Sequence, residues 1–471
     1  MPSVRGINRT IRRGIKEPRN RCGGKKTAEV AVEQDKEVKL IFARAIKAEK
    51  FDLEAVEAAL RAAVLTSGAK ALETVLACVG RGRRSQPMLC VCGAHMKSKG
   101  LKRKEVLTIL GKVVFRRSMY KCPVCGKKRY PADEDLDIEG TTRSPAVRRM
   151  MARAGSKQTF KEGSEDLRIY AGIKVSPKDV ERVAENIGKE VEQWLLREKE
   201  ELMKQSEQLG QPKKITTLYI SYDGTGVPMI PKEVKGRKGK QPDGSAKTRE
   251  AKIGCVFTQT FADKKGFPLR DEDSTTYFGA IEGADEFGER LYAEAVRRGL
   301  FEAQKVVVLG DGARWIKGLA EMHFSMATHI VDLYHAKEHI SNLCRILFGS
   351  NENLLTEHRI RWWTDLDEGN VEKIIIEATS KLRHSKGPAH KAETEINYFE
   401  TNKERMRYAQ FRRQGFFVGS GVVEAACGTV IGKRLKQSGM EWSLVGANAI
   451  IALRCLILSG RMEEFWELRC A

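Results

Sequence analysis

Residues 215–224 read ITTLYISYDG and residues 305–313 read KVVVLGDGA. Each stretch is an apolar, β-branched run that ends in Asp followed by Gly, a pattern typical of a strand buried in a sheet. The segments KIGCVFTQTF (252–261), DSTTYFGAI (273–281) and ATHIVDLYH (327–335) predict three further strands. An amphipathic helix over 285–299 and a short helix around Trp315 lie between them. This order predicts an α/β fold in which helices cover a mixed sheet.

Three acidic residues stand where such a sheet would bring them together. Asp223 and Asp311 end their strands, and Glu424 lies early in a predicted helix, GSGVVEAACGTVIGKRLKQ (419–437). Carboxylate oxygens are the ligands that hard divalent cations select, and two such ions ~3.5–4 Å apart can stabilise both oxygens of a phosphodiester exchange. The alternative is that each Asp-Gly pair is an ordinary turn at the end of a strand.

Two pairs of cysteines flank a β-rich segment. Cys90 and Cys92 precede VLTILGKVVFRRSMY (106–120), and Cys122 and Cys125 follow it. Four thiolates on two knuckles are the ligand set of a structural zinc ribbon. The first pair has one intervening residue instead of two, so His95 is an alternative ligand, and four unrelated reduced thiols are the other alternative.

The chain of 471 residues carries a formal net charge of +22, which favours polyanionic partners. The first 27 residues contain nine Lys or Arg and one acid. A basic loop, Lys232–Arg249, follows the Asp223 strand, and Lys433, Arg434 and Lys436 lie on the predicted Glu424 helix. We expect these groups to contact DNA phosphates, although a solvated surface loop would have the same composition.

The chain divides by composition into seven segments. They are a basic flexible arm (1–27), a helical N-terminal region (28–86), a zinc-ribbon-like module (87–140), a helical region that is a candidate helix-turn-helix (141–212), the first part of the α/β domain (213–335), an all-α insertion (336–408) and its last part (409–471). The most apolar late segment, residues 446–460, is too short and too polar to span a bilayer, and the N-terminus lacks the apolar stretch of a secretory signal. We therefore expect a cytoplasmic, nucleoid-associated protein without a membrane partner.

The motifs resemble those of a known family. SYDGTGVPM, GRKGKQPDG, KIGCVFTQT, DSTTYFGA, VVVLGDGARWI, IVDLYHAKEH, RMRYAQFR, VGSGVVEA and IGKRLKQSGMEWS, between about residues 87 and 465, resemble the ISKra family of insertion-sequence transposases, which is similar to the Mutator-like DDE transposases. The resemblance implies a ribonuclease-H-like domain interrupted by an all-α insertion before the glutamate.

The resemblance also implies roles for individual residues. Asp223, Asp311 and Glu424 would be a DDE triad that binds magnesium or manganese, with separations of 88 and 113 residues. Asp332 and His335 resemble a D-x-x-H motif, in which Asp332 would orient a catalytic His335. A satisfied core histidine is the alternative. Of the adjacent Trp362 and Trp363, we expect one in the core, and the other could stack on an unpaired base.

The implied activity is metal-dependent cleavage and strand transfer at the ends of a DNA element. Its partners would be double-stranded DNA, both element ends and target, and a second protomer. Three alternatives differ in class: a nuclease that only hydrolyses DNA, a non-catalytic DNA-binding derivative, and a sugar- or nucleotide-binding α/β protein. The last lacks support, because no Gly-rich phosphate fingerprint follows the first strand.

Overall fold

The computed structural model describes residues 53–470, except 80, 205–213, 350 and 384–387. The chain forms two compact units, Met1–Val147 and Arg148–Ala471. The predicted basic arm and the first part of the predicted helical region lie outside the described residues.

In the first unit, a helix packs on a long β-hairpin. The elements are α3 (Leu53–Val79), β1 (Lys97–Thr108), β2 (Gly111–Lys121), β3 (Lys128–Arg129) and α4 (Pro131–Asp135). The strands form an antiparallel sheet in the order β1-β2-β3, and α3 contacts β2, where the Val114 N–H donates to Glu73 at 2.6 Å. A buried Arg117–Asp133 ion pair, 2.7 Å long, ties β2 to α4. The predicted β-rich segment between the cysteine pairs is therefore the turn and second strand of a hairpin, together with the end of its first strand.

Helix α3 is the one described helix that is by itself long and apolar enough to cross a membrane, judged by length and composition alone. Only 11% of its most apolar window is buried. Helices α18 (Leu444–Leu458) and α19 (Met462–Cys470) meet the same test only as a pair bent by 109°. One such helix is weak evidence for a membrane span, and the absence of a membrane partner stays a prediction.

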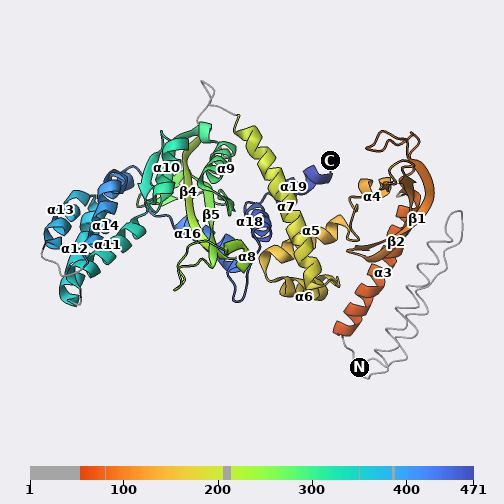
Figure 1. Cartoon of the computed structure of the whole chain (residues 1–471), viewed down its shortest axis with the longest axis horizontal. Helices are drawn as coiled ribbons and strands as arrows, with labels where there is room; N and C mark the ends of the chain where they lie inside the picture. Colours follow the sequence, from red (N-terminus) through yellow and green to blue (C-terminus); the bar gives the residue numbers. More distant parts are fainter. Residues whose placement is uncertain (1–52, 80, 205–213, 350, 384–387, 471) are drawn as a thin grey trace, which may run out of the picture. The chain divides into compact units, whose positions relative to one another are not determined.

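The second unit is built on a five-stranded mixed sheet with the order β10-β9-β4-β5-β8. Figure 1 labels its neighbouring strands β4 and β5. Its strands are β4 (Ile215–Pro228), β5 (Thr248–Gln259), β8 (Thr276–Ala280), β9 (Ala303–Gly310) and β10 (Thr328–Val331). β4 pairs antiparallel with β5 and parallel with β9, and β9 pairs parallel with β10. A small hairpin, β6 (Phe261–Ala262) and β7 (Pro268–Leu269), extends from the end of β5. The prediction of a mixed α/β fold is confirmed.

Alternating side chains of the central strands fill the two faces of this sheet. Leu218, Ile220 and Tyr222 of β4 pack in the core with α9 (Ala284–Arg297) and α10 (Arg314–His323). On the other face, Tyr219 stacks on Phe257 with ring centroids 4.8 Å apart. Asp223 continues the Tyr219 face, because residues two apart along a strand share a face.

Three described helices precede the sheet in this part of the chain, and all but the first three of their residues belong to the same compact unit. They are α5 (Pro145–Lys157), α6 (Phe160–Ala171) and α7 (Pro177–Leu202). α7 packs on α18 and α9, and a Cβ at Gly188 would overlap the Ala449 carbonyl, so glycine permits close approach of α7 and α18. In the last part of the region predicted as helical, α7 is one continuous helix whose N-cap, Ser176, accepts the Asp179 N–H at 3.1 Å. The boundary between the two compact units falls between Val147 and Arg148, near the start of α5.

The predicted all-α insertion is present, and it begins earlier than expected. Its elements are α11 (Leu333–Phe348), α12 (Glu352–Glu368), α13 (Val371–Leu382), α14 (Ala389–Asn402), a 3₁₀ turn (Lys403–Met406) and α15 (Tyr408–Arg413), and α11 to α14 are grouped together in Figure 1. The predicted strand ATHIVDLYH ends at Val331. Asp332 then caps α11 by accepting the His335 N–H at 2.7 Å, which places His335 in a helix.

The adjacent tryptophans of the insertion divide as predicted. Trp362 is fully buried, and its indole N–H donates to Glu377 at 3.0 Å. Trp363 is half-buried, with the cations of Lys337 and Arg359 at 5.8 and 5.5 Å from the ring centroid. A base could stack on Trp363 only if those cations moved.

Candidate metal centres

The two aspartates meet because two neighbouring strands run parallel. The parallel pairing of β4 and β9 extends to Ser221 and Leu309. Asp223 comes two residues after this pairing, and Asp311 directly follows β9. The prediction that Asp223 ends its strand is wrong, because β4 continues to Pro228 paired with β5. Asp223 lies instead where β4 loses β9 as a neighbour, so that side of its backbone is open.

Asp223 is a half-buried carboxyl in an acidic environment. It accepts its neighbour's Gly224 N–H at 2.6 Å, and the Cys427 thiol lies 3.8 Å from its other oxygen. Burial raises the pKa of Asp223, and the charge of Asp311 raises it further, whereas the Gly224 hydrogen bond and the charge of His335 lower it. A divalent cation would offset both the burial and the repulsion, so the site favours such an ion electrostatically.

Asp311 sits in a short, constrained loop between β9 and α10. Its carboxylate accepts the Ala313 N–H at 2.8 Å, and its backbone carbonyl accepts the Tyr398 hydroxyl at 2.9 Å. Gly312 follows with φ +86°, a conformation that favours glycine. The loop therefore has a defined conformation, held by a residue of the insertion that the sequence pattern did not single out.

Glu424 lies on a short helix over the sheet. α16 (Gly421–Ala426) continues into a π-helical segment (Cys427–Gly432) and α17 (Lys433–Leu435). α16 contacts β4 and β5, and the side chain of Glu424 is about half-exposed, at 51%. The Ser420 hydroxyl lies 3.3 Å from Glu424 Oε1, and His335 Nε2 lies 3.9 Å from the same oxygen. The irregular π segment is the part of this helical run that brings Cys427 to Asp223.

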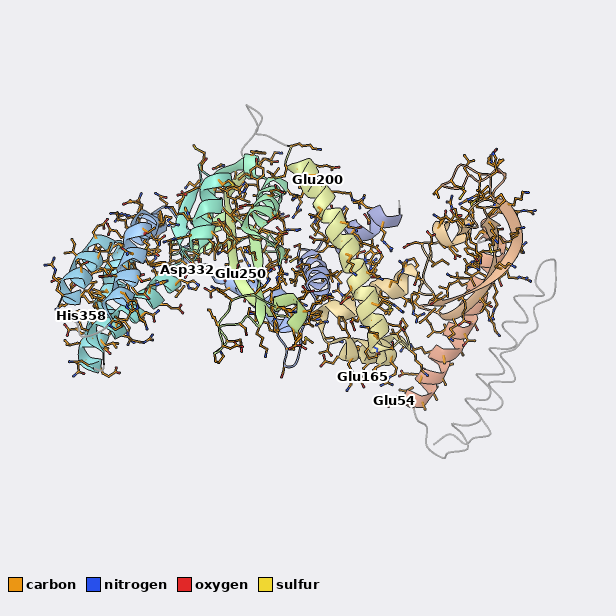
Figure 2. The ribbon with its side chains drawn as sticks, viewed as in Figure 1. Glu54, Glu165, Glu200, Glu250, Asp332 and His358 are labelled. Carbon is orange, nitrogen blue, oxygen red and sulfur yellow. The ribbon has the colours of Figure 1, made fainter. Side chains whose placement is uncertain are left out.

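Asp332 ties these pieces together. It is fully buried where the insertion meets the sheet (Figure 2). One carboxylate oxygen accepts the His335 N–H, the other accepts the Ser420 N–H, and the backbone N–H of Asp332 donates to the Gly310 carbonyl at 2.7 Å. Asp332 thus holds the residue before Asp311, the start of α11 and the start of α16 at one point.

The five predicted residues do not form one ligand shell. Ligand atoms of Asp332, His335 and Glu424 lie within 4.8 Å of one another, whereas Asp223, Asp311 and Glu424 do not meet this criterion together, although all are described. Each oxygen of Asp332 already accepts a backbone hydrogen bond, so Asp332 positions the backbone here in addition to lying within ligand distance of His335 and Glu424. Asp223 and Asp311 interact electrostatically. His335 interacts with Asp223 and Glu424: its charge lowers the pKa of Asp223, and its Nε2 atom lies 3.9 Å from Glu424.

The four cysteines of the first unit come together as predicted. Their sulfur atoms lie within 4.8 Å of one another, with 3.5 Å from Cys90 to Cys125 and 3.5 Å from Cys92 to Cys122. Sulfurs around a tetrahedral zinc would be about 3.8 Å apart, given Zn–S bonds of ~2.3 Å. The Cys125 N–H donates to the Cys122 sulfur and lowers the pKa of that thiol to about 6. This cluster could hold a zinc ion, and His95 lies outside it.

The predicted phosphate-binding cations differ in exposure. Lys433 and Lys436 are exposed, and the Lys436 ammonium donates to the Thr225 hydroxyl at 2.6 Å, two residues beyond Asp223. Arg434 is fully buried, donates to the Gly155 carbonyl at 2.8 Å and lies between the rings of Phe160 and Trp442. The prediction that Arg434 contacts phosphate is wrong for this structure, because the guanidinium instead joins α17 to α5.

The basic loop Lys232–Arg249 is largely exposed and partly ordered. It contains a helical turn, α8 (Pro231–Val234), a bridge between Lys238 and Ser245, and the start of β5. Since β5 runs beside β4, the loop emerges at the same end of β4 as Asp223.

Similarity to known proteins was measured at the levels of sequence and structure. A UPF0236 protein of Caldanaerobacter subterraneus subsp. tengcongensis is 23% identical over 370 residues, which are 76% of this chain and 68% of the relative. A second UPF0236 protein of that organism is 22% identical over 368 residues, with the same coverage. The Drosophila P element transposase strand transfer complex matches 72% of this chain and 85% of its own chain with 10% identity and a TM-score of 0.23, a value at which two structures need not share a fold. A family model matches residues 46–467, and the chain belongs to that uncharacterised protein family, UPF0236.

Proposed function

We propose that this protein is a transposase of a bacterial insertion sequence with a ribonuclease-H-like catalytic domain, and that the resemblance to the ISKra family reflects common function. One observation carries the proposal. Two aspartates on adjacent parallel strands, Asp223 and Asp311, interact electrostatically near the carboxyl end of β9, and the Glu424 helix packs on β4 and β5. An acidic site of this kind, in a protein with a net charge of +22, suits metal-dependent chemistry on a polyanion.

Asp223, Asp311 and Glu424 would hold magnesium or manganese. Bound ions of this type would supply activation of the attacking oxygen and stabilisation of the leaving oxygen. In the first reaction, water attacks a phosphodiester at the element end, the bond from phosphorus to the 3′ oxygen breaks, and a 3′ hydroxyl and a 5′ phosphate result. In the second, that 3′ hydroxyl attacks a target phosphodiester, so one bond to phosphorus forms as another breaks and a target 3′ hydroxyl is released.

His335 supplies the group that can move a proton in this site. Its Nε2 lies 3.9 Å from Glu424, and its ring is about one third exposed. An imidazole in this position can accept a proton from an attacking oxygen and can also balance the acidic charge as an imidazolium. Asp332 would orient His335 through the capping hydrogen bond and would not bind the metal itself.

DNA would contact both units. On the second unit, exposed Lys436 and the basic loop lie at the end of β4 that carries Asp223. On the first unit, residues 97–129 contain twelve Lys or Arg and one acid, so this segment supplies half of the net charge of the chain. Synapsis of two element ends requires at least a second protomer, and the proposal places the protein in the cytoplasm with the nucleoid.

The deciding experiment is an in vitro assay with candidate element ends and Mg²⁺ or Mn²⁺. We expect nicking at the element end in the wild type and none in Asp223→Ala, although both proteins fold and bind DNA. A pre-cleaved substrate with a free 3′ hydroxyl should then be joined to target DNA. Nicking without joining would indicate a hydrolytic nuclease on the same site, and DNA binding without either reaction would indicate a non-catalytic derivative.

A further inference from the structure

We propose that Tyr398, on insertion helix α14, is a positioning residue that fixes the Asp311 loop, so that the all-α insertion governs how well the acidic site binds its cation. The inference rests on the proposed function for the meaning of the acidic site, but the contact itself is independent of it. Tyr398 lies 87 residues after Asp311 in the chain, and its role is visible only in the fold.

The contact is a single, well-defined hydrogen bond. The Tyr398 hydroxyl donates to the Asp311 backbone carbonyl over 2.9 Å. The same aspartate uses its carboxylate to accept the Ala313 N–H at 2.8 Å, so both ends of the residue are held. Burial raises the pKa of Tyr398, and the charge of Asp311 raises it further, so the phenol stays protonated and remains a donor at physiological pH.

The Tyr398 ring is held by a second contact within the insertion. His339 of α11 stacks on it with centroids 3.6 Å apart and planes at 20°. The His339 Nδ1 atom lies 2.5 Å from Glu395, which precedes Tyr398 by almost one turn of α14. A ring fixed on one face and at its hydroxyl has little freedom left, so it transmits the position of α14 to the loop.

The Tyr398 ring packs so closely on Gly312 that a side chain at position 312 would crowd it. A Cβ there would lie 3.0 Å from a Tyr398 ring carbon and 3.1 Å from its hydroxyl oxygen. Glycine also fits the φ of +86° at this position. Two features of the loop, its conformation and its lack of a side chain, are therefore matched to Tyr398.

The insertion contacts the other side of the site as well. Its first helix, α11, begins at Asp332, whose carboxylate accepts the Ser420 N–H four residues before Glu424. Two helices of the insertion therefore act on two different acids, α14 through Tyr398 on Asp311 and α11 through its cap Asp332 on the Glu424 helix. A change in the insertion, such as contact with DNA, would act on both ligands together.

The test compares Tyr398→Phe with Tyr219→Phe in the full-length protein. Each variant keeps its aromatic ring and loses one hydroxyl, but Tyr219 bonds to Gln259 and Phe417, away from Asp311. Hydrogen exchange in metal-free protein should rise over residues 309–316 in Tyr398→Phe and stay at the wild-type level in Tyr219→Phe. Calorimetric titration with Mn²⁺ should show affinity about three- to tenfold weaker in Tyr398→Phe only, the effect expected for one lost hydrogen bond.

Each outcome has a distinct meaning. Unchanged exchange over residues 309–316 in a folded Tyr398→Phe protein would overturn the inference, whatever the protein does with metal. Increased exchange together with weaker Mn²⁺ binding supports it. Increased exchange in a protein whose wild type shows no Mn²⁺ binding sensitive to Asp223→Asn would instead defeat the proposed function, and with it the link to the cation. Gly312→Ala, which crowds the same ring, should increase exchange over the same residues and serves if Tyr398→Phe does not fold.

Discussion

Asp223 combines a catalytic proposal with a cost in stability. Burial and the charge of Asp311 raise its pKa above the ordinary 3.8, so the folded protein holds this proton more tightly than the unfolded chain does. Stability therefore falls as pH rises from about 3.8 through the folded-state pKa, and the cost is fully present at neutral pH. We predict that Asp223→Asn raises the urea midpoint at pH 7 in metal-free buffer, while cleavage is lost.

The pH and metal dependence of that gain provide its control. The difference between wild type and Asp223→Asn should shrink as pH is lowered through the folded-state pKa toward the ordinary 3.8, because the Asp223 carboxyl then takes up its proton. It should also shrink when Mn²⁺ is added at pH 7, because the ion stabilises only the wild type. An Asn variant that is less stable than wild type at pH 7 would show that Asp223 is a structural turn residue.

Two basic residues of one short helix should behave in opposite ways. Lys436 is exposed beside Thr225, so Lys436→Ala should weaken DNA binding at all sequences and reduce the slope of log K against log[salt] by roughly 1, with little change in stability. Arg434 is buried between two rings, so Arg434→Ala should cost roughly 2–4 kcal/mol of unfolding free energy. Filter-binding titrations and urea denaturation of the two variants measure these effects. Loss of DNA binding without loss of stability in Arg434→Ala would contradict the assignment.

Some site residues could be predicted from the sequence, and others could not. The four cysteines were predictable, because two close pairs beside strands bring their sulfur atoms together. Asp223 and Asp311 lie on neighbouring parallel strands, but Asp223 lies within β4 and not at its end, because the pairing with β5 continues to Pro228. Arg434 was assigned wrongly, since one-dimensional charge does not tell whether aromatic rings from distant segments enclose it. Tyr398 carried no pattern at all, because its partner lies 87 residues away.

At the scale of elements, the cysteine knuckles are expected to depend on metal. The turns at Gly93 and Gly126, with φ of +81° and +73°, bring the sulfurs together. The apolar cluster beside them consists of only a few side chains. We predict that zinc holds this end of the hairpin, and that Cys122→Ser/Cys125→Ser reduces zinc from one per chain to none. Metal analysis and hydrogen exchange over residues 88–130 test this. Zinc retained by the double variant would refute the assignment.

The β1–β2 hairpin is the element that we expect to carry much of the DNA affinity. Lys99 and Lys121 are exposed near the knuckles and line a shallow cavity there, whereas Lys112, at the other end of β2, pairs with Glu105 at 3.3 Å. Lys99→Ala/Lys121→Ala should weaken DNA binding several-fold at 100 mM salt and lower the salt slope by roughly 2. Lys112→Ala is the matched control and should change binding by less than twofold. Equal effects from both proteins would show that the charge acts only at long range.

Element boundaries were the least predictable feature, for identifiable reasons. The strand predicted through His335 stops at Val331 because the Asp332 side chain caps a helix there, and an apolar run does not reveal a cap. Helix α7 continues past the point where its sequence becomes charged, because burial on α18 ends gradually along its length. The described parts of residues 333–413 form helices, in line with a sequence pattern that contains no strand-like run there.

For the whole molecule, binding and chemistry should separate. Most of the net positive charge lies far in sequence from the three acids, and DNA affinity that arises from released counterions needs no divalent metal. We predict that Asp223→Ala/Asp311→Ala binds element DNA as tightly as wild type, or slightly more tightly because two negative charges are gone, with an unchanged salt slope and no cleavage. The measurement is a set of titrations between 50 and 300 mM salt in EDTA, together with the cleavage assay in Mg²⁺. Affinity that collapses in the double variant would mean that the acids support the fold of the DNA-binding surface, and the acidic edge would then be a structural feature of the sheet instead of the centre of catalysis.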